Sequence, residues 1–179
     1  MSTKQFLLSG FGGQGILFTG KMLAYKGLVD DKQVSWLPSY GPEMRGGTAS
    51  CSVIISDEPV GSPIVSKPDI LVAMNLPSLD KFEETVVPGG MIFYDSSLIE
   101  REVKRTDVKA YPVPATKLAG ENGFPTLANM ILMGKLLKAL GEFDEEAVTN
   151  TLKKVISAKR ADMIDVNLKA MKLGADYEA

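Results

Sequence analysis

The sequence predicts an α/β fold: a Rossmann-like, largely parallel sheet flanked by helices, with a helical C-terminal third. Three observations predict it. Short apolar runs alternate with helical patterns through residues 4–95, an order typical of parallel strands joined by crossover helices. The first run leads directly into a glycine-rich turn and then a helical pattern. After residue 126, apolar residues recur at helical spacing.

Each element follows from a local pattern. Apolar and β-branched runs read as strands, and the last of them is an edge strand because Pro112 cannot donate to a ladder. Helices are predicted where apolar residues recur every three or four positions between turn formers. The predicted strands are residues 4–9, 33–37, 48–55, 69–74, 91–95 and 109–113, and the predicted helices are 15–29, 77–84, 126–140, one that begins at 144, and 160–173.

The predicted helix over 126–140 has the strongest pattern. Thr126 is its expected N-cap and Gly141 its expected stop, while Gly174 is expected to end the final helix. The helix is apolar on nearly every side, which predicts that it is buried in the core or shared with a partner chain. Its apolar residues are Leu127, Met130, Ile131, Leu132, Met133, Leu136, Leu137 and Leu140.

Length and composition predict a single domain over residues 1–179. The formal net charge is −2 and no basic run occurs, so nucleic acid is not an expected partner. No apolar run reaches the roughly 20 residues of a membrane span, and the N-terminus lacks the features of a signal peptide. We therefore expect a cytoplasmic protein without a membrane partner.

The inventory of reactive side chains is small. The chain has one cysteine, Cys51, and no histidine. An iron–sulfur cluster needs about four thiolates, a zinc site uses Cys and His, and a Ser-His-Asp triad needs a histidine. We therefore predict no catalytic residue and no metal site on this chain. Cys51 lies in an alternating run and is interpreted as a small buried strand residue, not a nucleophile.

The turn after the first strand is the first candidate site. Gly10, Gly12 and Gly15 fit the G-x-G-x-x-G spacing of dinucleotide-binding turns, and a helix N-terminus at this place favours an anion. Glycines are also what a tight strand-to-helix turn requires. Both interpretations stay open from the motif alone. The candidate residues of this glycine loop are Gly10, Gly12, Gly13, Gln14 and Gly15.

A second candidate loop follows the strand predicted at 33–37. Arg45 can bind an anion or a partner chain, while its charge and that of Glu43 can equally be solvated or paired with each other. Asn75 follows a buried strand, at the end where α/β proteins bind ligands. The candidate residues of the second loop are Pro42, Glu43, Arg45, Gly46 and Gly47.

The two loops together closely resemble those of the gamma subunit of 2-oxoacid:ferredoxin oxidoreductases. The resemblance covers nearly the whole chain, and the Gly-Pro-Glu-Met-Arg-Gly-Gly-Thr-Ala form is more similar to the 2-oxoglutarate and branched-chain types than to the pyruvate type. It is carried by Gly10-Phe11-Gly12-Gly13-Gln14-Gly15, Ser39-Tyr40-Gly41-Pro42-Glu43-Met44-Arg45-Gly46-Gly47-Thr48, Ala73-Met74-Asn75, Pro88-Gly89-Gly90, Pro114-Ala115-Thr116 and Leu127-Ala128-Asn129-Met130.

The resemblance implies an activity of a complex. That activity is the oxidative decarboxylation of a 2-oxoacid with coenzyme A, which gives an acyl-CoA, carbon dioxide and reduced ferredoxin. Thiamine diphosphate, magnesium and iron–sulfur clusters are implied on the alpha, beta and ferredoxin-like delta subunits, so the isolated chain is expected to be inactive. For this chain the resemblance implies an accessory role in CoA recruitment, with the glycine loop, Arg45 and Asn75 near CoA phosphates or a neighbouring subunit.

Two other functions stay open. The chain can be a purely structural assembly subunit, in which both loops only pack against neighbours and methionines supply adaptable contacts. It can also be a nicotinamide-dependent dehydrogenase domain, which would carry an acidic residue at the end of the second strand. That strand ends Leu37-Pro38-Ser39, and Asp30 and Asp31 precede it, so the dehydrogenase interpretation is disfavoured.

Overall fold

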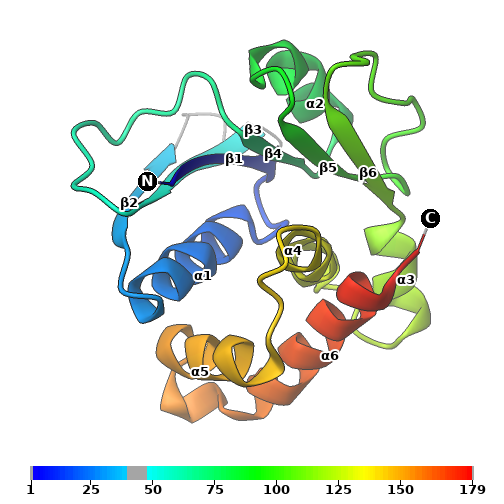
Figure 1. The fold of residues 1–179 in the computed structure, drawn as a ribbon. Coiled ribbons are helices and arrows are strands. Elements are labelled where there is room, and N and C mark those ends of the chain that lie inside the picture. The colour runs from blue at the N-terminus through cyan, green and yellow to red at the C-terminus, as the bar shows by residue number, and fades with distance from the viewer. Residues whose placement is uncertain (1, 40–47, 179) are drawn as a thin grey trace.

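The computed structural model describes residues 2–39 and 48–178 as a sheet with helices on both faces. The sheet has six strands in the order β2-β3-β1-β4-β5-β6. Helix α2 covers one face, and α1 and α4 cover the other, with α5 and α6 forming a further layer beneath them (Figure 1). The strands are β1 (Thr3–Phe11), β2 (Gln33–Ser39), β3 (Thr48–Ser56), β4 (Ile70–Ala73), β5 (Met91–Asp95) and β6 (Lys109–Val113).

The sheet is mostly parallel, as predicted, with one antiparallel strand. β1, β4, β5 and β6 pair in parallel, and β6 is the edge strand that Pro112 predicted. β3 is antiparallel to both of its neighbours, β1 and β2. The second strand in sequence, β2, therefore lies at the far edge and is separated from β1 by β3.

The helices follow the predicted pattern with one addition. The structure adds α3, a helix of seven residues that begins directly after Pro114. Its shortness and the glycine at position 120 hide it from a search for helical periodicity. The helical elements are α1 (Ile16–Val29), α2 (Leu76–Phe82), the 3₁₀ helix η1 (Glu83–Thr85), α3 (Ala115–Glu121), α4 (Ala128–Ala139), α5 (Glu145–Val155), the 3₁₀ helix η2 (Ala158–Arg160) and α6 (Asp162–Asp176).

Two predicted helix ends are wrong. Thr126 does not cap α4: the N-cap is Leu127, which has no side-chain capping bond. Gly174 does not end α6, which continues to Asp176. A Cβ on Gly174 would lie 1.8 Å from the carbonyl oxygen of Ile131 on α4. Gly174 is therefore needed for close helix packing and not for a helix stop.

Helix α4 is buried within this chain. The side chains of Met130, Ile131, Leu132 and Leu136 are fully buried in the main core, which lies between the sheet and the helices α1, α4 and α6. A smaller core under α2 contains Leu79 and residues from β4 and β5. The core alternative that the sequence left open for α4 is confirmed. Met133 and Met171 are core residues as well.

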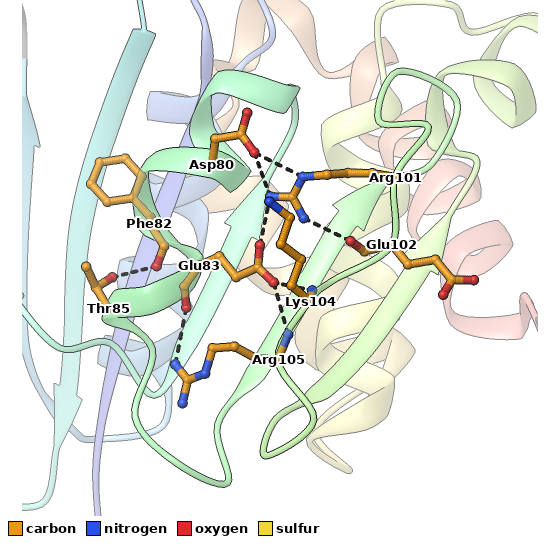
Figure 2. A network of polar contacts seen from close by, with 8 residues as sticks. All are labelled: Asp80, Phe82, Glu83, Thr85, Arg101, Glu102, Lys104 and Arg105. Atoms are coloured by element: carbon orange, nitrogen blue, oxygen red, sulfur yellow. Dashed lines mark hydrogen bonds and ion pairs between the residues drawn. The ribbon is translucent and has the colours of Figure 1, made fainter.

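A polar network on the α2 side holds the segment between β5 and β6. The carboxylate of Glu83 is buried, and it accepts hydrogen bonds from the guanidinium of Arg101 at 2.7 Å and from the backbone N–H groups of Lys104 and Arg105. The Arg105 guanidinium donates to the carbonyl oxygen of Glu83 (Figure 2). This buried charge is thus satisfied by partners from a neighbouring segment, which is a structural use of the carboxylate.

No helix among residues 2–39 and 48–178 combines the length and apolar character needed to cross a bilayer.

Candidate functional site

The glycine loop leaves the carboxyl end of β1 beside the end of β4. The side chain of Gln14 joins the two ends. Its Nε2 donates to the carbonyl oxygen of Met74 at 3.1 Å, and its Oε1 accepts from the backbone N–H of Phe11 at 2.6 Å. The structure therefore brings the glycine loop and Asn75, which follows Met74, to one edge of the sheet. In open α/β sheets this edge is the usual place for a ligand.

Three of the loop glycines are explained by close packing or by backbone conformation. A Cβ on Gly10 would lie 2.6 Å from Gln14 Oε1, and a Cβ on Gly15 would lie 2.4 Å from Asn129 Nδ2. Gly13 and Gly15 also have φ angles of 94° and 76°, which disfavour other residues. The turn interpretation thus accounts for Gly10, Gly13 and Gly15, whereas Gly12 is exposed.

The start of α1 retains free hydrogen-bond donors. Its N-cap, Gly15, offers no side-chain cap. Within the described ranges, the backbone N–H groups of Ile16, Leu17 and Phe18 donate no hydrogen bond to protein. Free N–H groups and the helix dipole together favour a bound anion. The anion interpretation of the loop is therefore compatible with its packing role.

Asn75 is both a helix cap and an unused donor. Its side chain is buried, and its Oδ1 accepts the backbone N–H of Ser78 at 2.8 Å, which caps α2. This bond fixes the orientation of the amide. Its Nδ2 finds no acceptor in the part of the chain that the structure describes. Asn75 can therefore donate one further hydrogen bond at the ligand edge of the sheet.

The structure describes only the residues that flank the second loop. Pro42, Glu43, Arg45, Gly46 and Gly47 lie outside the described residues, so their predicted roles stay predictions. The flanking strands are informative, however. Thr48 at the start of β3 pairs with Phe11 at the end of β1, and Ser39 at the end of β2 pairs with Ser50. The second loop therefore leaves and rejoins the sheet at the same edge as the glycine loop.

A pocket beside the glycine loop was not predicted from the sequence. It has a volume of about 440 Å³ and lies between the starts of α1, α4 and α6 and the end of α5. Asn129 links two of these elements, because its Nδ2 donates to Gly15 O at 3.3 Å and to Thr19 Oγ1 at 2.9 Å. Periodicity gives no signal for this pocket, since its lining comes from segments far apart in sequence. They include Phe18, Leu127, Asn129, Ile156, Arg160 and Asn167.

Cys51 is a core residue and not a nucleophile. Its side chain is buried, and its Sγ lies 3.6 Å from the carbonyl oxygen of Ile16. Burial raises the pKa of the thiol to about 12, and a hydrogen bond from Trp36 lowers it only in part. The structural interpretation of this cysteine is confirmed. Across residues 2–39 and 48–178, no cluster of three His, Cys, Asp or Glu side chains could hold a metal ion.

The topology gives further reason to disfavour a nicotinamide site. In the Rossmann arrangement the strand that carries the ribose-binding acid lies next to the first strand. Here β3 occupies that place and runs antiparallel, and β2 lies one strand further out. An acidic residue at the end of β2 would thus be two strands away from the glycine loop.

The family profile and the related proteins that match this chain indicate one family. The profile described as "Pyruvate ferredoxin/flavodoxin oxidoreductase" matches residues 5–177. The chain is 44% identical over 172 residues to the ketoisovalerate oxidoreductase subunit VorA of Methanothermobacter marburgensis. The aligned region covers 95% of this chain and 35% of VorA. The chain is also 37% identical over 152 residues to the 2-oxoglutarate synthase subunit KorC of Methanocaldococcus jannaschii. Here the aligned region covers 83% of this chain and 81% of KorC.

A solved structure shows the same fold. The gamma subunit of a keto/oxoacid ferredoxin oxidoreductase from Geobacter sulfurreducens superposes with a TM-score of 0.81 at 26% identity, covering 97% of this chain and 96% of that one. The lengths of the relatives differ. This chain spans about a third of the VorA subunit but most of KorC and of the Geobacter subunit.

Proposed function

This chain belongs to the pyruvate ferredoxin/flavodoxin oxidoreductase family, and we propose that it serves as the gamma subunit of a 2-oxoacid:ferredoxin oxidoreductase. The proposed complex converts a 2-oxoacid and coenzyme A to an acyl-CoA, carbon dioxide and reduced ferredoxin. The single observation that carries the proposal is the family match, which extends over nearly the whole chain. We also propose that residues 1–179 act as one domain.

The substrate class follows from the relatives. VorA is named for ketoisovalerate and KorC for 2-oxoglutarate. We therefore propose a branched-chain 2-oxoacid or 2-oxoglutarate, in preference to pyruvate. The second loop supports the same class through its Gly-Pro-Glu-Met-Arg-Gly-Gly-Thr-Ala form.

The chemistry is assigned to partner chains. With one buried cysteine and no histidine, this chain offers no thiolate or imidazole for an iron–sulfur cluster. Thiamine diphosphate, magnesium and the clusters accordingly belong to alpha, beta and ferredoxin-like delta subunits in the proposed complex, which passes electrons to ferredoxin. The isolated chain is then inactive. The cytoplasm is the proposed compartment, because CoA and ferredoxin meet the complex there.

The proposed role of this chain is to help recruit CoA. The glycine loop, Asn75 and both ends of the second loop lie at one edge of the sheet. The free N–H groups at the start of α1 and the unused Asn75 Nδ2 are donors suited to phosphate oxygens. Arg45, from the second loop, would add a guanidinium that can bind phosphate through two N–H groups.

A kinetic experiment on the assembled complex tests CoA recruitment. The double variant Gly12→Glu, Arg45→Ala places a carboxylate at the loop and removes the guanidinium. We expect the KM for CoA to rise about tenfold to a hundredfold with little change in kcat, as for lost charge-assisted bonds. Gly61→Glu is the control, because no atom lies within 4 Å of a Cβ at this position. A wild-type KM for CoA in the double variant would contradict the proposal.

A structural assembly role is the second candidate, and one feature favours it. Three exposed apolar side chains lie at or shortly after the carboxyl ends of β1, β4 and β5: Phe11, Leu76 and Leu98 are 39%, 39% and 44% exposed. Apolar side chains gathered at one sheet edge are typical of a contact surface. If the glycine loop serves only this contact, the double variant loses association with the other subunits on gel filtration, and the complex that remains has an unchanged KM.

A further inference from the structure

We propose that the pocket between the starts of α1, α4 and α6 binds a phosphorylated nucleoside. Its volume of about 440 Å³ falls within the range of small-molecule sites. Three features carry the proposal: two buried amide oxygens without partners, two uncapped helix N-termini, and an arginine with no ion pair among the described residues. The pocket shares the start of α1 with the glycine loop, but the inference goes beyond CoA recruitment by that loop, because it also rests on Asn129, Asn167 and Arg160.

The amide oxygens are the most specific of these features. Asn129 and Asn167 line the pocket and are only 4% and 3% exposed, and neither Oδ1 has a hydrogen-bond partner in the described structure. Their orientations are fixed, because Asn167 Nδ2 donates to Met163 O at 2.7 Å and Asn129 Nδ2 to Gly15 O. A buried acceptor without a donor is costly. A ligand with N–H or O–H groups would satisfy both oxygens.

The helix ends provide positive potential. Gly15 is the N-cap of α1 and Leu127 the N-cap of α4, and both residues line the pocket. Neither helix has a side-chain cap, so unpaired N–H groups remain at both N-termini. Two such helix ends at one pocket favour an anion more than one does.

Arg160 adds a full positive charge to the same pocket. It is exposed at the end of η2, and across residues 2–39 and 48–178 it forms no ion pair. A guanidinium presents parallel N–H groups that match the oxygens of a phosphate. Together with two helix N-termini, Arg160 suits the double charge of a phosphate monoester better than the single charge of a carboxylate.

The remaining lining is apolar. Phe18, Val155, Ile156 and Met163 are half-buried and give the pocket walls for a flat ring. A nucleobase fits such walls, and its amino group or the ribose hydroxyls supply the donors that the two asparagine oxygens lack. The ligand therefore combines a phosphate, N–H or O–H donors and an aromatic face. A free nucleotide and the nucleotide end of CoA both have this chemistry.

Calorimetric titration of the full chain, alone and in the assembled complex, tests the proposal with four probes: AMP, CoA, pantetheine and inorganic phosphate. We expect AMP to bind at least tenfold more tightly than inorganic phosphate, and pantetheine not to bind. Binding of CoA in competition with AMP assigns the pocket to the nucleotide end of CoA, and AMP binding without CoA binding assigns it to a free nucleotide. Both outcomes support the pocket.

Two variants complete the test. Arg160→Gln should weaken AMP binding about tenfold to a hundredfold, while Lys159→Gln, which removes the neighbouring exposed charge outside the pocket lining, should leave it unchanged. Asn167→Leu removes a buried unpaired oxygen, so it should weaken AMP binding without lowering the melting temperature of the free chain. Absence of AMP binding at millimolar concentration, equal affinity for phosphate and AMP, or unchanged AMP binding in Arg160→Gln would overturn the proposal, whatever the result for the KM of CoA.

Discussion

Gly134 of α4 and Gly174 of α6 lie where the two helices touch backbone to backbone. A Cβ on Gly134 would lie 1.9 Å from the carbonyl oxygen of Met171, and a Cβ on Gly174 would lie 1.8 Å from that of Ile131. Both contacts are to backbone atoms, which cannot move aside as a flexible side chain can. The fit of the two helices thus depends on both glycines.

Replacing either helix glycine should destabilise the fold. We expect Gly134→Ala to lower the free energy of unfolding by about 2–4 kcal/mol, because α6 must move away from the core helix α4. Urea unfolding followed by circular dichroism measures the change. Gly120→Ala in α3 is the control: nothing lies within 4 Å of its Cβ, so the gain in helix propensity should stabilise the chain by about 0.5–1 kcal/mol. Equal losses in both variants would refute the packing argument.

Cys51 should be inert in the folded chain. Burial raises its pKa to about 12, so at pH 8 only about one thiol in ten thousand is ionised, and the sulfur is also out of reach of a reagent. A colorimetric disulfide reagent at pH 8 should therefore react over hours with native protein and within seconds in urea. Rapid reaction of one thiol per native chain would contradict the core placement.

Glu142 should stabilise the fold in a pH-dependent way. Burial opposes its ionisation, but the hydrogen bond from Lys4 and the charges of Lys26 and Lys4 outweigh burial and hold the pKa of Glu142 below the ordinary value of 4.5. Because the folded-state pKa is depressed, this contribution is complete above the unfolded pKa and is lost as the pH falls through the folded one.

The variant Glu142→Gln tests whether the stabilisation by Glu142 is lost as the pH falls. We expect a loss of about 1 kcal/mol in the free energy of unfolding at pH 7, and a difference from the native chain that shrinks as the pH falls below 4.5. Urea titrations at several pH values measure it. Glu100→Gln, at an exposed position, should show no such trend. A deficit at pH 3 as large as the deficit at pH 7 would mean that the loss is not electrostatic.

The fold should depend strongly on the carboxylate of Glu83. Its removal leaves the Arg101 guanidinium without one of its two acidic partners and leaves the backbone N–H groups of Lys104 and Arg105 without their acceptor (Figure 2). We expect Glu83→Ala to cost about 3–5 kcal/mol in unfolding measurements. The adjacent Glu84→Ala, at an exposed position, should change stability by less than about 0.5 kcal/mol. Similar effects in both variants would argue against the network.

Most elements of the fold are readable from local pattern. Period-2 and continuous apolar runs predict all six strands, and β5 and β6 begin and end where the pattern does. The helical pattern of α4, apolar on nearly every side, predicts a helix that is buried in the core or shared with a partner chain, and the structure selects the core. The direction of β3 was not predicted, because a strand sequence does not encode which way its neighbour runs.

Local sequence patterns likewise predict one part of the candidate site and miss another part. The glycine loop and Asn75 stand out because turns and strand ends have local signatures, and the structure joins them through Gln14. The contact between Asn129 and Gly15 has no local signature, since 114 positions separate the two residues. Only the structure shows that the side chain of Asn129 holds the start of α1.

The sequence by itself therefore determined the order and type of the elements other than α3, and the family resemblance, because each depends on residue type and spacing along the chain. The tertiary structure alone decided that Gly174 packs a helix instead of ending one, and that Asn129, Arg160 and Asn167 share a pocket. These relationships depend on how α1, α4 and α6 pack against one another. Packing of this kind is set by side-chain shapes across the whole core, which no local pattern records.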